Sequence, residues 1–372
     1  EEHTQHTDRT YGCDEEYTYV EVEKILEDAG VGYVKIGVPT EERHILATLH
    51  DATYQFGIDY LRDVWYSTSY LLDRKQSMNG CAKKRFENYK QQPLEFVFDK
   101  SFTGKLSQFG LDPNRRTPSG IKAAIIREKG TNGEREMAYM LYLAGFDVKD
   151  VTMTDLISGR ETLEDINMVV YCGGFSNSDV LGSAKGWAGS FLFNPKAKAA
   201  LDNFYAREDT LSLGVCNGCQ LMMELGLITP EDKKKGKMLH NDSHKFESNF
   251  LGVTVPMNRS VMFGSLSGSK LGIWVAHGAG KFSLPYPEDH YNVVLKYSYD
   301  EYPGNPNGSD YSVAGIASQD GRHLAMMPHL ERACFPWENA YYPLDRKEED
   351  QITPWMEAFV NARKWVEANR KK

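Results

Sequence analysis

The segment 211–223 places Cys216 at the apex of a Gly-x-Cys-x-Gly turn, between an apolar, strand-like run and the apolar start of a helix. Small residues two positions to either side permit a strained strand-to-helix turn, a nucleophile elbow, which raises the side chain clear of the sheet. The thiol then lies near a helix N-terminus, where the helix dipole and free amides favour the thiolate. The pattern predicts a nucleophilic cysteine at position 216.

A histidine and a carboxylate separated by one residue, His329 and Glu331, lie far downstream of this turn. Cysteine, histidine and glutamate are together the side chains that acyl transfer through a thioester requires. We therefore expect Cys216, His329 and Glu331 to meet as a catalytic triad.

Cys216 and Cys219 also form a CxxC pair, which leaves a redox dithiol, half of a zinc site or a buried apolar cysteine as alternatives. A thioredoxin-like dithiol usually has an aromatic-Cys-Gly-Pro-Cys pattern in a domain of about 100 residues. A structural zinc site needs two more ligands at close spacing, and neither Cys172 nor Cys334 has such partners. The distant histidine and glutamate favour the nucleophile.

The composition is that of a globular protein with room for two or three domains in its 372 residues. A net charge of −9 argues against a nucleic acid or a membrane surface as partner, and no apolar run reaches the ~18 residues of a membrane span. Six cysteines without a signal peptide favour the reducing cytoplasm over a disulfide framework. Because the chain lacks an initiator methionine, we expect it to be a piece of a longer protein.

Apolar runs alternate with amphipathic segments after a polar linker at 112–120 that contains proline and glycine. Such alternation predicts a parallel sheet with helices on both faces and with functional loops at the carboxyl ends of the strands. The elbow and the Gly173-Gly174 loop would lie at that edge. The expected strands are 121–126, 146–153, 165–171 and 211–215, and the expected helices are 134–145 and 196–205.

The pattern changes to a β-rich one after about residue 237, which predicts an antiparallel excursion before His329 returns to the site. An amphipathic helix over 354–371 closes the chain. Residues 1–111 carry no nucleophile, phosphate loop or metal cluster, and their expected helices are 19–30 and 54–72, with strands at 32–38 and 45–49.

Several motifs together resemble the glutaminase part of the phosphoribosylformylglycinamidine synthases, a family of triad-type glutamine amidotransferases. The elbow resembles the nucleophile motif of that family, and the resemblance extends over 121–365. The motifs that carry it are 127–133, 172–176, 179–182, 214–222, 302–309 and 327–332. Residues 1–111, with 65–70 and 94–99, resemble the end of the synthetase region that precedes the glutaminase in the large, single-chain form.

The resemblance implies a three-layer α/β, flavodoxin-like class I glutaminase domain with a mostly parallel sheet over 121–372. The linker 112–120 and a partial α+β tail of the second aminoimidazole-ribonucleotide-synthase-like half, 1–111, would precede it. Its substrate would be glutamine and its partner the synthetase region. No cofactor or metal is expected in this chain, whereas ATP and magnesium would bind the synthetase region, outside it.

The resemblance also implies roles for individual residues. Cys216 would attack the side-chain amide of glutamine, His329 would transfer the proton, and Glu331 would orient the imidazole. The remaining expected site residues are the oxyanion donors Gly174 and Asn217 and the substrate-binding residues Gly173, Phe175, Gln220 and Phe246.

Four places depart from the family pattern. Leu330 stands where proline is usual, Ala279 where glutamate is usual, Lys245 where arginine is usual, and residues 177–179 replace Tyr-Gly in the corresponding loop. Two other functions therefore remain alternatives to a glutaminase. One is a cysteine hydrolase of the same fold that acts on another amide, and the other is a non-catalytic docking fragment.

Overall fold

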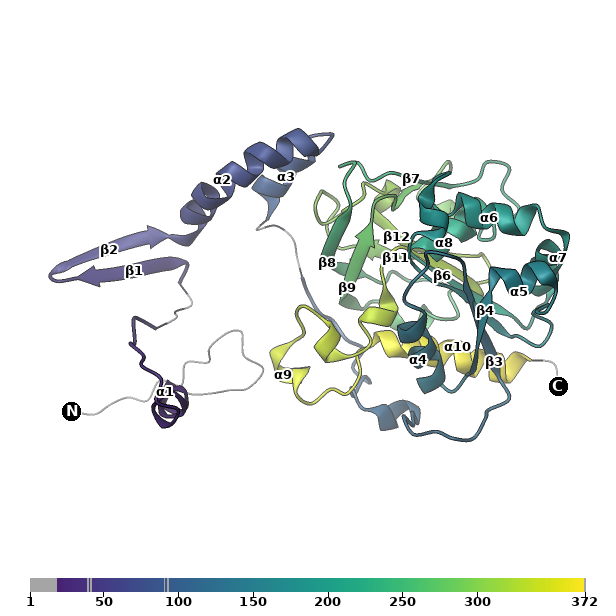
Figure 1. The fold of residues 1–372 in the computed structure, drawn as a ribbon, viewed down its shortest axis with the longest axis horizontal. Helices are drawn as coiled ribbons and strands as arrows, with labels where there is room; N and C mark the ends of the chain where they lie inside the picture. Colours follow the sequence, from purple (N-terminus) through teal and green to yellow (C-terminus); the bar gives the residue numbers. More distant parts are fainter. Residues whose placement is uncertain (1–18, 39, 41, 90, 92–93, 371–372) are drawn as a thin grey trace. The chain divides into compact units, whose positions relative to one another are not determined.

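The computed structural model describes residues 19–38, 40, 42–89, 91 and 94–370 (Figure 1). The chain divides into two compact units, Glu1–Ser69 and Tyr70–Lys372, and the boundary between them falls inside helix α2 (Ile58–Gln76). We describe each unit by itself.

A nine-stranded sheet in the order β4-β3-β5-β6-β13-β12-β11-β8-β9 forms the centre of unit Tyr70–Lys372. The strands from β4 to β13 run parallel, and those from β13 to β9 pair antiparallel. Their bounds are β3 Lys122–Arg127, β4 Asp147–Thr152, β5 Met168–Tyr171, β6 Leu211–Val215, β8 Glu247–Thr254, β9 Lys270–His277, β11 Asn292–Tyr297, β12 Val313–Ala317 and β13 His323–Met326.

The contacts between helices form two groups, one of α4 with α10 and one of α5, α6, α7 and α8 (Figure 1). The helices are α4 Glu134–Leu143, α5 Met153–Ser158, α6 Lys185–Leu192, α7 Pro195–Ala206, α8 Asn217–Glu224 and α10 Trp355–Asn369. The central strands β5, β6 and β13 are buried along their whole length, as expected of parallel strands covered on both faces. This is the predicted three-layer α/β fold.

The antiparallel half of the sheet returns the chain to the site. Strand β9 ends at His277 and pairs with β8 over its full length, while β12 pairs with β13, whose carboxyl end leads to His329. A small separate sheet of β7 (Lys237–Leu239) and β10 (Lys281–Ser283) flanks these strands. The predicted antiparallel excursion is therefore confirmed, and it joins the same sheet as the parallel strands.

The segment that precedes the sheet packs into the same unit. Helix α3 (Cys81–Asn88) follows the end of α2, and Val97 forms an antiparallel bridge with Lys270 at the start of β9. Within the expected linker, Arg115 donates hydrogen bonds to the Asp147 side chain and to the carbonyl of Phe146. The unit boundary thus lies upstream of the expected linker, and the assignment of 1–111 to a synthetase tail remains a proposal.

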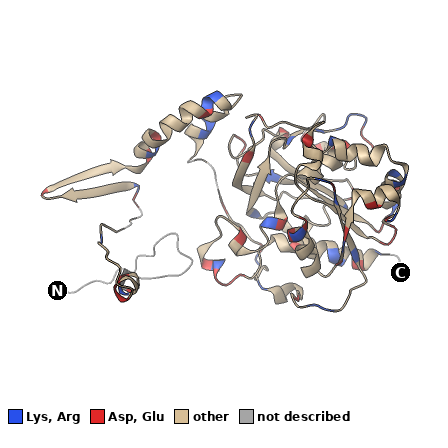
Figure 2. Ribbon diagram, in the orientation of Figure 1, with Lys and Arg blue, Asp and Glu red and all other residues tan. Residues whose placement is uncertain are grey.

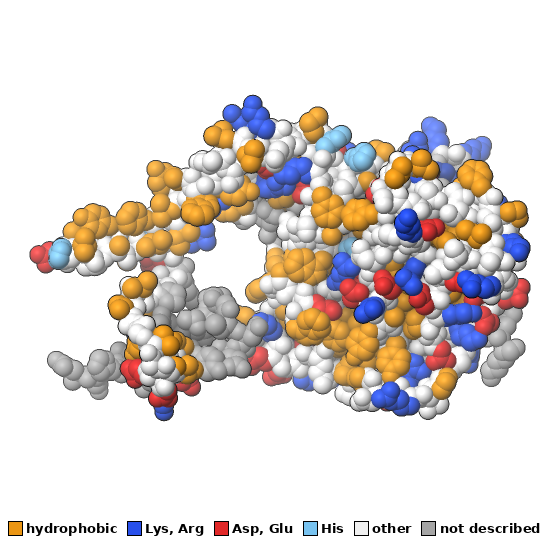
Figure 3. All heavy atoms as spheres, in the orientation of Figure 1, with side chains coloured by type: hydrophobic (Ala, Val, Ile, Leu, Met, Phe, Trp, Pro, Cys, Tyr) orange, Lys and Arg blue, Asp and Glu red, His pale blue; other side chains and the backbone are white. Residues whose placement is uncertain are grey.

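Unit Glu1–Ser69 contains helix α1 (Tyr19–Asp28) and a hairpin of β1 (His44–Leu49) and β2 (Ala52–Gly57). The register places only apolar residues on one hairpin face, where Ile45 lies opposite Phe56, Ala47 opposite Tyr54 and Leu49 opposite Ala52. The opposite face carries mostly polar residues. Figure 3 shows hydrophobic side chains at the hairpin surface, and Leu49 is 62% exposed. Within the described residues this apolar face is uncovered.

Local predictions in this unit were partly wrong. The helix expected over 54–72 begins only at Ile58, because residues 52–57 pair with β1, and no strand forms at 32–38.

Charged residues of both signs are scattered along the ribbon of the sheet-containing unit and do not form a single basic face (Figure 2). None of the helices in the described part of the chain has the length and apolar character that crossing a bilayer requires.

Candidate active site

Cys216 occupies a strained turn between β6 and α8. Its φ of 53° and ψ of −106° lie outside the ordinary regions for a non-glycine residue. The two flanking glycines permit this turn, because a Cβ at Gly214 would lie 2.5 Å from the Gly218 carbonyl oxygen and one at Gly218 would lie 2.0 Å from that of Tyr171. The geometry is that of the predicted nucleophile elbow.

His329 and Glu331 follow β13, the neighbour of β6. The Nδ1 atom of His329 lies 2.7 Å from Oε1 of Glu331, and both side chains are buried. Since an ionised carboxylate only accepts hydrogen bonds, Nδ1 carries a proton and Nε2 is left for other partners. The backbone N–H of His329 donates to the carbonyl of Trp274 on β9, which fixes the residue against the sheet.

Cys216 and His329 both lie next to Gly173, in the loop after β5. A Cβ at Gly173 would lie 2.8 Å from Cε1 of His329, 3.6 Å from its Nε2 and 3.4 Å from Cβ of Cys216. A side chain at position 173 would therefore collide with the imidazole, so this position beside both residues requires glycine. The structure brings the three residues of the expected triad together at the carboxyl edge of the sheet.

The electrostatics of the triad favour a protonated imidazole. Burial lowers the pKa of His329, but the Glu331 carboxylate and the adjacent Cys216 side chain outweigh it, and the pKa is raised to about 10. His277, at the end of β9, behaves in the opposite way. It is buried, none of the described carboxylates pairs with it, and burial lowers its pKa to about 4. An imidazolium next to sulfur stabilises the thiolate.

Two backbone N–H groups next to Cys216 have no acceptor in the part of the chain that the structure describes: those of Gly174 and Asn217. Asn217 is the first residue of α8, where N–H groups have no partner within the helix. Gly174 has a φ of +123°, and a Cβ there would lie 2.6 Å from the carbonyl oxygen of Gly130. Free donors at these positions are what an oxyanion requires.

Phe175 and Phe246, two of the expected substrate-binding residues, lie against each other with ring centroids 5.9 Å apart. Both are about half exposed, so they form an open apolar surface. The side chain of Gln220 is buried instead. It accepts from Nδ2 of Asn217 at 2.8 Å and donates to the carbonyl of Ala279 at 2.7 Å. Gln220 thus braces the first turn of α8, and its contact with substrate remains a proposal.

The second cysteine of the CxxC pair lies in a different environment from the first. Cys219 is fully buried on α8, and burial raises its pKa well above the ordinary value. All cysteines of the described residues are free thiols. Three or more histidine, cysteine, aspartate or glutamate side chains do not gather into a possible metal site anywhere in the described ranges. The geometry favours the nucleophile over the redox and zinc alternatives.

The sequence model of the CobB/CobQ-like glutamine amidotransferase domain matches residues 120–366. The chain belongs to this glutamine amidotransferase family.

Relatives and solved structures agree with this assignment. The chain is 40% identical over 339 residues to the phosphoribosylformylglycinamidine synthase of Homo sapiens, covering 82% of this chain and 24% of that protein. It is 35% identical over 375 residues to the protein of the same name from Drosophila melanogaster, covering 94% and 27%. The chain thus spans about a quarter of the length of these relatives.

The structure is also similar to a chain in the solved structure of PurLQS from Thermotoga maritima, with a TM-score of 0.51 and 27% sequence identity. The match covers 66% of this chain and 99% of that one. The likeness therefore concerns one part of the present chain, of the size of the amidotransferase domain.

Two of the departures from the family pattern, Leu330 and Ala279, leave the amidotransferase site intact. Leu330 is fully buried in the 3-10 turn Leu330–Arg332, so core packing holds the loop between His329 and Glu331. At Ala279, Gln220 bonds to the backbone carbonyl, which any residue would offer. Lys245 forms an ion pair with Asp73.

The sequence alone did not reveal three further contributors to the site. The carbonyl of Ala276 accepts a hydrogen bond from Sγ of Cys216 at 3.6 Å. Asn241 is fully buried and connects three backbone segments, with bonds to the carbonyls of Lys245 and His277 and from the N–H of Gly280. Arg332 lies 3.8 Å from Glu331. Only Arg332, which directly follows the His-x-Glu motif, carried a local sequence signal.

Proposed function

We propose that this chain hydrolyses glutamine to glutamate and ammonia through a thioester on Cys216. The observation that carries the proposal is that Cys216 and the His329–Glu331 pair both lie next to Gly173, at an elbow of an amidotransferase domain. Thiolate, imidazolium and carboxylate are the groups that acyl transfer needs.

In the first step the Cys216 thiolate attacks the side-chain amide carbon of glutamine, after its proton has passed to Nε2 of His329. The N–H groups of Gly174 and Asn217 donate hydrogen bonds to the resulting oxyanion, and removal of one such donor typically raises the barrier by ~3 kcal/mol. The imidazolium then gives its proton to the leaving nitrogen, the C–N bond breaks, and ammonia leaves. A thioester remains on Cys216.

In the second step water attacks the thioester, while the neutral His329 takes a proton from the attacking water. The C–S bond breaks, and glutamate leaves with the thiolate restored. Glu331 stabilises the charged imidazole throughout, without itself becoming protonated. Phe175, Phe246, Gly173 and Gln220 would line the substrate pocket.

The ammonia would serve a phosphoribosylformylglycinamidine synthase, in which a synthetase region uses ATP and magnesium to convert formylglycinamide ribonucleotide to formylglycinamidine ribonucleotide. The names of the relatives and their fourfold greater length support this. The apolar face of the β1–β2 hairpin is exposed, which supports the proposal that a further stretch of polypeptide covers it. The free thiols of the described cysteines support a location in the reducing cytoplasm.

The proposal is tested by incubating the purified chain with glutamine and measuring glutamate and ammonia. We expect both products in equal amounts, and neither from the Cys216→Ala variant. Release of glutamate by that variant, or none by the unaltered chain, would contradict a Cys216 thioester. Formylglycinamidine ribonucleotide should form only after a synthetase region, its nucleotide substrate and ATP are added.

A further inference from the structure

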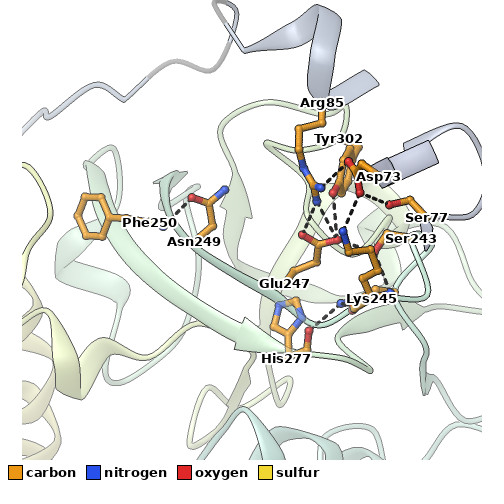
Figure 4. A network of polar contacts seen from close by, with 11 residues as sticks. Asp73, Ser77, Arg85, Ser243, Lys245, Glu247, Asn249, Phe250, His277 and Tyr302 are labelled. Carbon is orange, nitrogen blue, oxygen red and sulfur yellow. Dashed lines mark hydrogen bonds and ion pairs between the residues drawn. The ribbon is translucent and has the colours of Figure 1, made fainter. Parts of the chain in front are cut away.

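Four charged side chains, two of each sign, meet beside the candidate active site (Figure 4). Asp73, in the last turn of α2, accepts from Nζ of Lys245 at 2.7 Å and from Nη1 of Arg85 at 2.8 Å. Nη2 of Arg85 reaches on to Glu247 at 3.1 Å, so the charges alternate in sign along one chain of contacts. All four residues lie in unit Tyr70–Lys372.

The two acids of this network are buried and satisfied. Glu247 also accepts from the hydroxyls of Ser243 and Tyr302, and Asp73 accepts from that of Ser77. Burial opposes the ionised form of Asp73, yet the hydrogen bonds from Lys245 and Ser77 and the charge of Arg85 hold its pKa below the ordinary value. A buried carboxylate with this many partners is held in one position and in turn holds its partners in place, unlike a solvated surface charge.

The network holds both neighbours of Phe246 in the sequence. Lys245 precedes that residue and Glu247 follows it, while the ring of Phe246 packs on Phe175, whose loop carries Gly174. The side-chain contacts of Lys245 and Glu247 therefore fix the backbone from which the half-exposed Phe246 ring projects. Phe246 itself contributes no charge that could anchor it.

The turn between α2 and α3 is attached to the same loop by two more bonds. The N–H of Met78 donates to the carbonyl of Ser243 at 3.0 Å, and Nδ2 of Asn79 donates to that of Asp242 at 2.8 Å. The end of α2 and the segment 241–247 are thus one connected piece of structure. The triad, by contrast, is held by β6, β9 and β13.

We propose that Asp73 and Lys245 are positioning residues for the glutaminase reaction, whose ion pair holds Phe246 against Phe175 at the entrance of the glutamine pocket. The inference rests on the proposed function and extends the site to a helix outside the matched domain. Because the pair does not belong to the triad, its loss weakens the hold on glutamine and leaves the chemical steps unaltered.

The test compares Lys245→Met and Asp73→Asn with the unaltered chain. Lys245→Met leaves Asp73 its bonds to Arg85 and Ser77, so the variant keeps the buried acid paired and folds. Lys245→Arg restores the charge, and Lys122→Met, which removes an exposed ion pair with Asp165, is the matched control. Steady-state glutamine hydrolysis and hydrogen exchange of the amides in 241–247 are measured for each.

We expect KM for glutamine to rise about tenfold in Lys245→Met and in Asp73→Asn, equivalent to about 1.4 kcal/mol, with kcat within about twofold. The double variant should resemble Asp73→Asn alone, because the side chain of Lys245 acts through its contact with Asp73. Amide exchange in 241–247 should be faster in both variants. Lys245→Arg and Lys122→Met should match the unaltered chain.

Unchanged exchange in 241–247, additive effects in the double variant, or a loss confined to kcat would each overturn the proposal. An unaltered chain that released no glutamate would instead contradict the proposed function. In that case the exchange rates would still decide whether the ion pair orders the loop that carries Phe246.

Discussion

A potential nucleophile from β6 and a histidine from β13 lie together at each end of this strand pair. Only one of the two ends has the geometry of a catalytic site. Near the amino ends, Ser212 and His323 are direct neighbours across the two strands, and Oγ lies 3.0 Å from Nδ1. Just past the carboxyl ends, Cys216 lies beside His329. The residue types alone do not distinguish these two pairs.

The surroundings distinguish them. His329 has a carboxylate on its far nitrogen, and its pKa is raised to about 10, whereas burial and the nearby Arg322 lower the pKa of His323 to about 4. Ser212 is fully buried in regular strand and accepts a hydrogen bond from Tyr205, while Cys216 lies at a strained turn before a helix. A nucleophile therefore needs a chargeable base, free amide donors and a position at a strained turn before a helix, rather than in a regular strand.

The largest expected effect concerns the two nucleophile positions. Cys216→Ala should lower the rate of glutamine hydrolysis by about 10⁵-fold, because no other group can form the thioester. Ser212→Ala should leave that rate within about twofold and cost about 2 kcal/mol of unfolding free energy, since it removes buried hydrogen bonds. Kinetics and chemical denaturation measure both quantities. A comparable loss of rate in the two variants would break the comparison.

The carboxylate should have the next largest effect. Glu331→Gln should lower kcat by about 10³-fold or more, because the imidazolium loses the charge that stabilises it. Its counterpart at the amino ends, Asp320→Asn, should leave kcat unchanged, although Asp320 pairs with Arg322 next to His323. The measurement is kcat with saturating glutamine. Equal activity of Glu331→Gln and the unaltered chain would show that the carboxylate does not distinguish the two ends.

A methyl group at Gly173 should lower kcat/KM by about 10²-fold, because its Cβ would lie 2.8 Å from Cε1 of His329 and would displace the ring. Gly264→Ala is the matched control, since a Cβ at Gly264 would meet no atom within 4 Å. The variant proteins are compared in kcat/KM and in thermal unfolding. Full activity in Gly173→Ala would mean that the ring does not work from its present position.

The smallest effect is on the pH profile. Because the folded-state pKa of His329 lies above its ordinary value of 6.5, the stabilisation from its charge is complete below pH 6.5 and is lost as the pH rises toward 10. Activity should therefore not fall between pH 7 and 9, and the alkaline limb of kcat/KM should lie near pH 10. In Glu331→Gln that limb should move to lower pH. A limb near 6.5 in the unaltered chain would contradict a charged His329.

The sequence predicted the parallel half of the sheet and the meeting of Cys216, His329 and Glu331 well, because both depend on local patterns. Continuous apolar runs became the buried strands β3, β5 and β6, and the glycines around Cys216 define the elbow within five residues. Cys216 and His329 are far apart in the sequence. Their proximity was still predictable, because the carboxyl ends of neighbouring parallel strands meet at one edge of a sheet.

The remaining features depend on contacts between distant segments, which no local pattern encodes. Strand β2 pairs with β1, and its residues 54–57 extend without a break into α2, so periodicity favoured a single helix. The roles of Asn241 and Asp73 arise from backbone groups and charges supplied by other elements. The packing of 94–102 into the sheet-containing unit is likewise a tertiary effect.

Covalent labelling of the intact chain with a glutamine-mimicking diazo-ketone tests the central claim most directly. Peptide mapping by mass spectrometry should find one adduct, on Cys216, with none on Cys219 or on the other described cysteines, because burial raises the pKa of each of those thiols. Excess glutamine should slow its formation, and the Glu331→Gln variant should be labelled more slowly. An adduct on Cys219, or labelling of Cys216 that glutamine does not slow, would contradict a glutamine site built around the Cys216 elbow.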